Sequence, residues 1–188
     1  MTKMKASTLL NVLDLQDNQN NIWLFTPSMW RILFPLESNN SLKISLQRHV
    51  KTGLLKKVKK GLYANERARC CPPYDKLNAL VPYLKPGEIN YISQESQLSD
   101  LGVISQIPLT YLSLMTTGNS QTFETCYGTV QFTCTKRDLD VIFDNTSYSD
   151  FNQLLVANEY LALRDLRRSG RNWGLVLEQR GKDREQAI

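Results

Sequence analysis

Basic side chains gather between residues 41 and 63, at spacings that suit contact with nucleic acid. Lys43, Gln47 and Lys51 lie four residues apart with Arg48 beside them, so on a helix they form one polar stripe. An arginine can bind guanine through two hydrogen bonds, and a glutamine can bind adenine in the same way. We therefore assign Gln47 and Arg48 to base contacts. We assign Lys43 and Lys51 to phosphates, for which a mobile point charge is enough.

A second basic group follows directly, and it consists of Lys56, Lys57, Lys59 and Lys60 just before Gly61. Apolar residues flank and separate these paired lysines and Gly61 follows, which predicts a short hairpin that adds affinity independent of base sequence and sensitive to salt. Residues 40–69 hold nine Lys or Arg and one Asp or Glu. A polar helix face alone is typical of a solvated surface, but this concentration of positive charge favours nucleic-acid binding.

Three helices are expected ahead of the hairpin, and this order indicates a winged helix-turn-helix, in which the last helix enters the major groove. Caps and breakers set the expected ends of these helices. We expect them over 5–15, from Thr26-Pro27 to Pro35, and from a cap at Asn40-Ser41 to Gly53. In the third, Leu42, Leu46, His49 and Val50 recur at helical spacing, so His49 should pack in the core and not bind metal.

The charge of the chain divides at a proline pair. Residues 1–70 hold 12 Lys or Arg against 4 Asp or Glu, whereas residues 71–188 hold 11 against 14. The net charge of +5 and the pI near 9.0 therefore come from the first part. Pro72 and Pro73 stiffen the backbone where the sign of the charge changes. We place a domain boundary there, between residues 1–70 and 71–188.

The second part has mixed patterns, which makes the chain as a whole α+β. Strands are expected where β-branched and aromatic residues alternate, and helices where apolar residues recur every three or four positions. The expected strands are 89–92, 111–115, 122–126 and 129–135, with a turn at Tyr127-Gly128, and the expected helices are 74–84, 93–101 and 150–169.

Four arginines, Arg164, Arg167, Arg168 and Arg171, share one face of the last expected helix. Cations are favoured near a helix C-terminus, so a solvated surface is one interpretation. The other is a second contact with an anionic partner, either flanking DNA or RNA.

Nothing in the sequence indicates catalysis, a metal or a cofactor. Asp138 and Asp140 follow two basic residues and are expected to open a helix, and the chain has one histidine and no phosphate-binding or nucleophile-elbow motif. The four cysteines lack metal-ligand spacing and are expected to be reduced. We predict that the protein is not an enzyme. No apolar run is long enough to span a membrane and the N-terminus lacks signal-peptide features, so we expect a cytoplasmic protein without membrane contact.

These patterns resemble the AbiEi family, the antitoxins and transcriptional regulators of type IV toxin–antitoxin systems. The likeness covers about residues 5–175 and is most specific over 42–63. It is carried by LKISLQRHVKTGLLKKVKKGLYA, YISQESQLSDLGVISQIP, TCYGTVQFTC and VANEYLALRDLRRSGR.

The resemblance implies a winged helix-turn-helix followed by a smaller mixed α/β domain of antitoxin type. It also implies a repressor that binds double-stranded DNA at inverted repeats in its own promoter, as a monomer on each half-site or as a dimer. Its functional partner would be a nucleotidyltransferase-type toxin, which it opposes without forming a tight complex. Two alternatives remain: a stand-alone regulator whose second domain senses a ligand or oligomerises, and an RNA-binding module.

Overall fold

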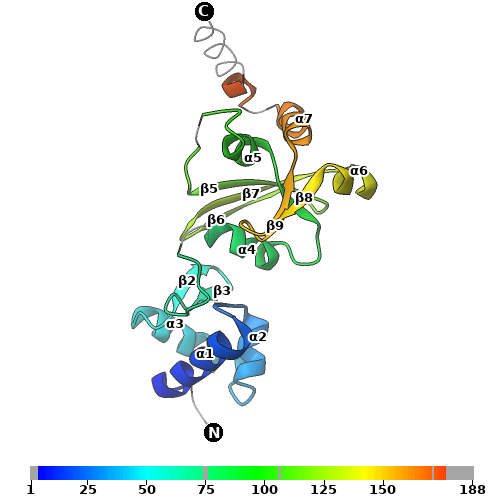
Figure 1. The fold of residues 1–188 in the computed structure, drawn as a ribbon. Coiled ribbons are helices and arrows are strands. Elements are labelled where there is room, and N and C mark those ends of the chain that lie inside the picture. Colours follow the sequence, from blue (N-terminus) through cyan, green and yellow to red (C-terminus); the bar gives the residue numbers. More distant parts are fainter. Residues whose placement is uncertain (1–3, 74–75, 106, 171, 177–188) are drawn as a thin grey trace, which may run out of the picture. The chain divides into compact units, whose positions relative to one another are not determined.

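The computed structural model describes residues 4–73, 76–105, 107–170 and 172–176. This part of the chain combines helices with one antiparallel and one mixed sheet, which confirms the α+β class. The chain divides into two compact units, Met1–Lys76 and Leu77–Ile188 (Figure 1). The second unit is the larger, so the expectation of a smaller second domain is wrong.

The first unit has three helices and a three-stranded antiparallel sheet in the strand order β1-β3-β2. The strand β1 was not predicted, because two residues are too short to show an alternating pattern. In chain order the elements are α1 (Ala6–Asn20), β1 (Leu24–Phe25), α2 (Pro27–Leu33), α3 (Asn39–Lys51), β2 (Lys56–Lys59) and β3 (Leu62–Ala64).

Aromatic residues form the centre of the first unit's core. The rings of Phe25 and Trp30 stack with centroids 4.7 Å apart, and Phe34 lies 6.2 Å from Trp30. The helix that carries Trp30 begins as predicted, with Thr26 as N-cap and Pro27 in the first turn. Leucines of α1 and α3 complete this cluster, so the three helices share one apolar core.

The second unit is built on a six-stranded mixed sheet in the order β6-β7-β5-β4-β9-β8. Figure 1 draws α5 and α7 on one side of this sheet and α4 on the other. The elements are α4 (Lys76–Leu84), β4 (Asn90–Ile92), α5 (Gln94–Asp100), β5 (Tyr111–Thr116), β6 (Gln121–Thr125), β7 (Gly128–Cys134), α6 (Leu139–Asp144), β8 (Thr146–Ser149), β9 (Leu154–Ala157) and α7 (Glu159–Ser169).

Two predictions for the second unit are wrong. The helix expected over 150–169 begins only at Glu159, because Leu154–Ala157 forms β9 and pairs in parallel with β4. The predicted turn at Tyr127-Gly128 lies one residue earlier, since Thr125 pairs with Gly128. Gly128 is instead the first residue of β7, where an added Cβ would collide with the carbonyl oxygen of Thr110.

A buried carboxylate on α1 holds in place the segment of chain that follows β3. Asp17 accepts hydrogen bonds from the backbone N–H groups of Arg69, at 2.8 Å, and Cys70, at 3.1 Å. These bonds favour the charged form and lower the pKa of Asp17. Burial and the nearby Asp17 raise the pKa of the Cys70 thiol to about 12, so Cys70 is protonated at neutral pH.

We expect Asp17→Asn to destabilise the first unit at neutral pH, because the amide replaces one acceptor oxygen with a donor that faces two N–H groups. The lowered pKa means that the stabilisation by Asp17 is present above the ordinary value of 3.8 and is lost as the pH falls through the lowered value. Urea unfolding at several pH values measures this, with Asp14→Asn, an exposed position on the same helix, as the control. A stability difference that persists at the most acidic pH would contradict this account.

Candidate nucleic-acid interface

The helix α3 begins earlier than predicted. Ser38 is its N-cap, and the Ser38 Oγ accepts a hydrogen bond from the N–H of Ser41 at 3.2 Å. The predicted cap at Asn40-Ser41 is therefore wrong, because both residues lie within the first turn. The helix ends at Lys51, and Gly53 follows with a φ of +72°, which glycine adopts readily.

The two faces of α3 are distributed as the sequence predicts. Leu42, Leu46 and His49 are buried in the core of the first unit. The stripe formed by Lys43, Gln47 and Lys51 is exposed. The polar residues assigned to DNA therefore lie on the solvent side of this helix, and the apolar residues hold its other side.

An isoleucine on the exposed side of α3 was missed by the sequence analysis. Ile44 is 65% exposed and lies three residues before Gln47 and four before Arg48. Residues 44, 47, 48 and 51 have the spacing of one helical face. An exposed aliphatic side chain among groups that bind polar base edges is suited to contact the methyl group of thymine. Its signal in the sequence is an apolar residue that falls outside the core pattern of Leu42 and Leu46.

Arg48 has a structural contact as well as an exposed position. Its Nη2 donates a hydrogen bond to the carbonyl oxygen of Met4 at 2.8 Å. The Nε2 of His49 lies 3.1 Å from the same oxygen. This contact holds Met4 against α3 and orients the Arg48 guanidinium, whose other N–H groups keep their capacity to donate.

The strands β2 and β3 form the predicted basic hairpin. Lys59 pairs with Leu62, so the connection is the two-residue turn Lys60-Gly61, and Gly61 has a φ of +84°. Lys60 at the turn and Lys57 on β2 are exposed. Val58 and Leu62 are buried, so the hairpin packs one side on the unit and presents lysines on the other.

The other two lysines of the hairpin are placed differently. The Lys56 Nζ lies 3.2 Å from the Glu66 Oε1, and the Lys76 Nζ lies 3.0 Å from the same oxygen. Lys59 is half-buried, and burial lowers its pKa. The four lysines were predicted to be equivalent, but Glu66, the one acid in residues 40–69, pairs with Lys56. Lys57 and Lys60 are thus the two lysines of this hairpin that are exposed.

Three of the four clustered arginines lie on α7 in the second unit. Arg164, Arg167 and Arg168 are exposed, and Arg171 lies outside the described residues. The Arg164 guanidinium is 5.4 Å from the centre of the Tyr160 ring and donates to the Tyr160 hydroxyl at 3.0 Å. The Arg167 guanidinium lies 6.0 Å from the Trp173 ring centre. These contacts orient two of the arginines without neutralising their charge.

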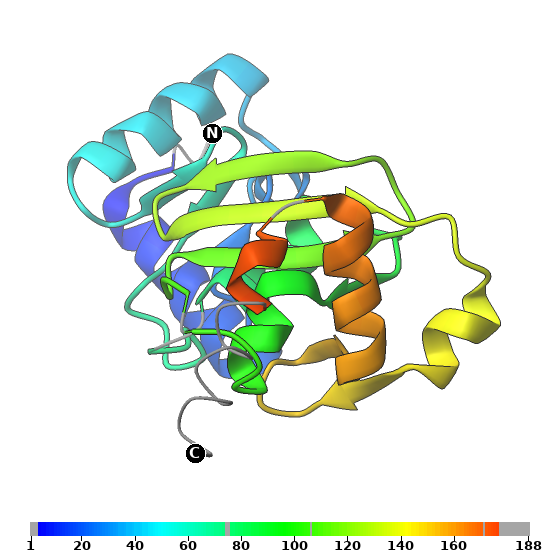
Figure 2. The same ribbon diagram turned by 90° about the horizontal axis from the view of Figure 1, so that it is seen from above.

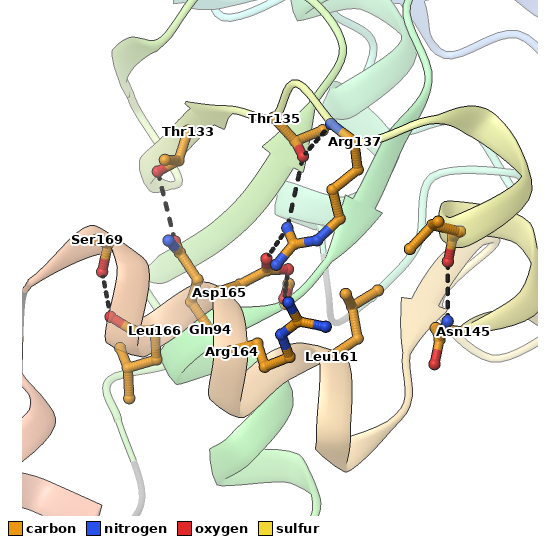
Figure 3. A network of polar contacts seen from close by, with 12 residues as sticks. Gln94, Thr133, Thr135, Arg137, Asn145, Leu161, Arg164, Asp165, Leu166 and Ser169 are labelled. Carbon is orange, nitrogen blue, oxygen red and sulfur yellow. Dashed lines mark hydrogen bonds and ion pairs between the residues drawn. The ribbon is translucent and has the colours of Figure 1, made fainter.

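A buried charge network fixes the opposite face of α7 (Figure 3). Asp165 is 1% exposed, forms an ion pair with Arg137, and accepts hydrogen bonds from the hydroxyls of Ser93, at 2.7 Å, and Tyr91, at 3.2 Å. Burial raises the pKa of Asp165, and the Ser93 hydroxyl and the Arg137 charge oppose this shift. The network therefore sets the rotation of α7 and with it the direction of the arginines.

The described residues contain no group of three or more His, Cys, Asp and Glu side chains arranged to hold a metal ion. The paired acids Asp138 and Asp140 lie at the start of α6, where Asp138 is the N-cap residue, as predicted. In the part of the chain that the structure covers, no helix has both the length and the hydropathy needed to cross a bilayer.

Comparison of this chain with protein-family models, curated proteins and solved structures finds no match. The assignment of function therefore depends on the chemistry of the two basic surfaces, on α3 with its hairpin and on α7. Of these, the first has the greater number of exposed cationic side chains.

We expect Arg137→Met to destabilise the protein by about 3–5 kcal/mol at neutral pH, because Asp165 keeps a buried charge without its partner. The variant raises the pKa of Asp165 further. The loss should thus be smallest below the ordinary value of 3.8, where the carboxyl is protonated, and should grow as the pH rises. Urea unfolding across this range measures the difference, with the exposed neighbour Lys136→Met as control. A loss of equal size at every pH would show that Arg137 acts through packing alone.

Proposed function

We propose that the first unit is a winged helix-turn-helix that binds double-stranded DNA, with α3 in the major groove and the β2–β3 hairpin along the phosphate backbone. The observation that carries this proposal is the exposed face of α3, which combines Gln47 and Arg48 with Lys43 and Lys51. The element order helix-strand-helix-helix-strand-strand, with a three-stranded sheet, supports it.

Each side chain on this face has a chemically distinct task in the proposal. Gln47 binds adenine and Arg48 binds guanine, each through two hydrogen bonds, while Ile44 contacts a thymine methyl group. Lys43 and Lys51 bind phosphates at either end of the helix and set its register on the duplex.

For the whole chain we propose a transcriptional repressor of its own operon. The likeness to AbiEi antitoxins supports a narrower role, in which the repressor also counteracts a nucleotidyltransferase-type toxin encoded beside it. A stand-alone regulator shares the same DNA-binding unit, and the identity of the downstream gene separates the two. An RNA-binding module is distinguished by competition between duplex DNA and RNA of matched length at fixed salt.

A footprint on the DNA upstream of the protein's own gene tests the proposal directly. We expect protection of two inverted half-sites, because a helix-turn-helix protein of this kind reads symmetric operators. Binding that is equally strong on any duplex of the same length would refute the repressor, and preference for RNA would favour the alternative module.

On the protected site, Gln47→Ala should weaken binding by about 1–3 kcal/mol, and binding to random duplex should change much less. Asn11→Ala, at an exposed position on α1, is the matched control. Fluorescence anisotropy on both duplexes measures the two effects. Equal losses on specific and random DNA would show that Gln47 contacts the backbone and does not read a base.

The hairpin lysines should change the salt dependence of binding. Lys57→Gln and Lys60→Gln are each expected to reduce the slope of log K against log salt by about 0.9, because each removes one phosphate contact. Lys56→Gln is the control within the same hairpin, since Lys56 forms an ion pair with Glu66. If all three substitutions change the slope equally, the exposure of Lys57 and Lys60 is not what decides phosphate contact.

A further inference from the structure

One margin of the second unit exposes an unusual number of apolar side chains. Six of the twelve large hydrophobic residues that are exposed in the described chain lie between Leu139 and Tyr160. They belong to α6, to β8, to the turn after β8 and to the first turn of α7. Figure 2 shows α6, in yellow, projecting at this margin. The six are Leu139, Val141, Phe143, Tyr148, Phe151 and Tyr160.

The strand β8 is the last strand of the sheet, so within the described residues one of its edges has no strand beside it. In edge strands, a lysine, a proline or a bulge normally prevents pairing with a strand of another chain. β8 has the sequence TSYS and contains no charge and no proline. The opposite edge strand, β6, carries the exposed Glu124. Backbone groups on β8 are therefore placed to pair with an added strand.

The apolar side chains continue a face that the core already uses. Tyr148 stands opposite Leu155, which packs against the core cluster beneath α7. Ile142 of α6 is buried in the same cluster, which anchors α6 while Leu139 and Phe143 remain exposed. Tyr148, at 57% exposed, thus continues this face of the sheet onto its outermost strand.

Local hydrogen bonds hold this margin in a fixed shape. Asn158 donates from its N–H to the carbonyl oxygen of Asn145 at 2.9 Å, which ties the end of α6 to the start of α7. In the turn after β8, the N–H of Gln153 donates to Ser149 at 2.7 Å, and Phe151 projects with 80% of its surface exposed. A preformed surface loses little conformational entropy when a partner binds.

The charge within the segment that forms this margin is negative, although Arg164 of α7 contacts Tyr160 at one end of it. Residues 138–160 contain five Asp or Glu and no Lys or Arg. A second copy of this chain would bring the same acids into opposition, which disfavours self-association here. A partner with positive charge would meet complementary groups. The acids are Asp138, Asp140, Asp144, Asp150 and Glu159, and all are exposed.

We propose that the β8 edge, with α6 and the turn at Phe151, docks an extended protein segment in which basic and apolar residues alternate. The segment adds a strand to β8 through main-chain hydrogen bonds. Its apolar side chains pack against Tyr148 and Phe143, and its lysines or arginines face the surrounding carboxylates. This surface belongs to the second unit, whereas the DNA-binding face proposed above belongs to the first.

A labelled peptide of alternating lysine and valine, added to the full chain, tests this docking. We expect it to bind, to slow hydrogen exchange of the amides in residues 146–149, and to bind about tenfold more weakly to Tyr148→Lys. Thr122→Lys places the same charge on the exposed side of β6, at the other edge, and should leave affinity unchanged. Both substitutions are at exposed positions, and circular dichroism checks that each variant is folded.

Three outcomes would overturn the proposal. Equal weakening by Thr122→Lys, or binding without slowed exchange in β8, would mean non-specific attraction between charges. Equal binding of a glutamate–valine peptide would remove the role of the acids. Self-association of the wild-type chain that Tyr148→Lys abolishes would assign the edge to a second copy.

Discussion

The rotation of α3 about its own axis is the constraint on which the proposed interface depends. Leu42 and Leu46 are buried against the aromatic core around Trp30, and burial of a leucine side chain is worth about 1.5–3 kcal/mol. A rotation by one residue, about 100°, would move a lysine toward the core and a leucine into water. The apolar face therefore determines which polar residues meet a partner, although it touches none itself.

The second unit fixes α7 by a different interaction. α7 also buries leucines, but Asp165 adds a charged contact with Arg137 and two hydroxyl groups. Burying such a network costs more free energy than burying apolar side chains, because both charged groups lose their hydration. It allows fewer arrangements, however, since each donor must meet its acceptor. The exposed arginines of α7 are thereby directed by a carboxylate on the opposite side of the same helix.

Much of the first unit could be predicted from sequence, because its signals are local. Thr26-Pro27 and Gly53 mark helix ends, and the helical spacing of Leu42, Leu46 and His49 identifies the buried face. The start of α3 was misplaced because several consecutive residues, Ser38 to Ser41, are all good caps. Ile44 and Glu66 were missed because their importance depends on exposure and on a neighbour in space.

In the second unit the decisive information is not local. Leu154, Leu155 and Val156 form a short apolar run that suits a helix or a strand equally well. Pairing with β4, more than sixty residues earlier in the chain, makes it a strand. The same holds for Asp165, whose partners Ser93 and Arg137 come from distant segments, so its burial has no signature in its own helix.

The separation of the two faces of α3 has an evolutionary consequence. Gln47 and Lys43 are exposed and lie outside the core, so substitutions there alter stability by only about 0.5 kcal/mol or less. Under the proposed function, preference for a DNA sequence can therefore drift between descendants of this protein without passing through unfolded intermediates. Arg48 is the exception, because its hydrogen bond to Met4 gives it a part in the fold. Position 48 should accordingly change more slowly than position 47.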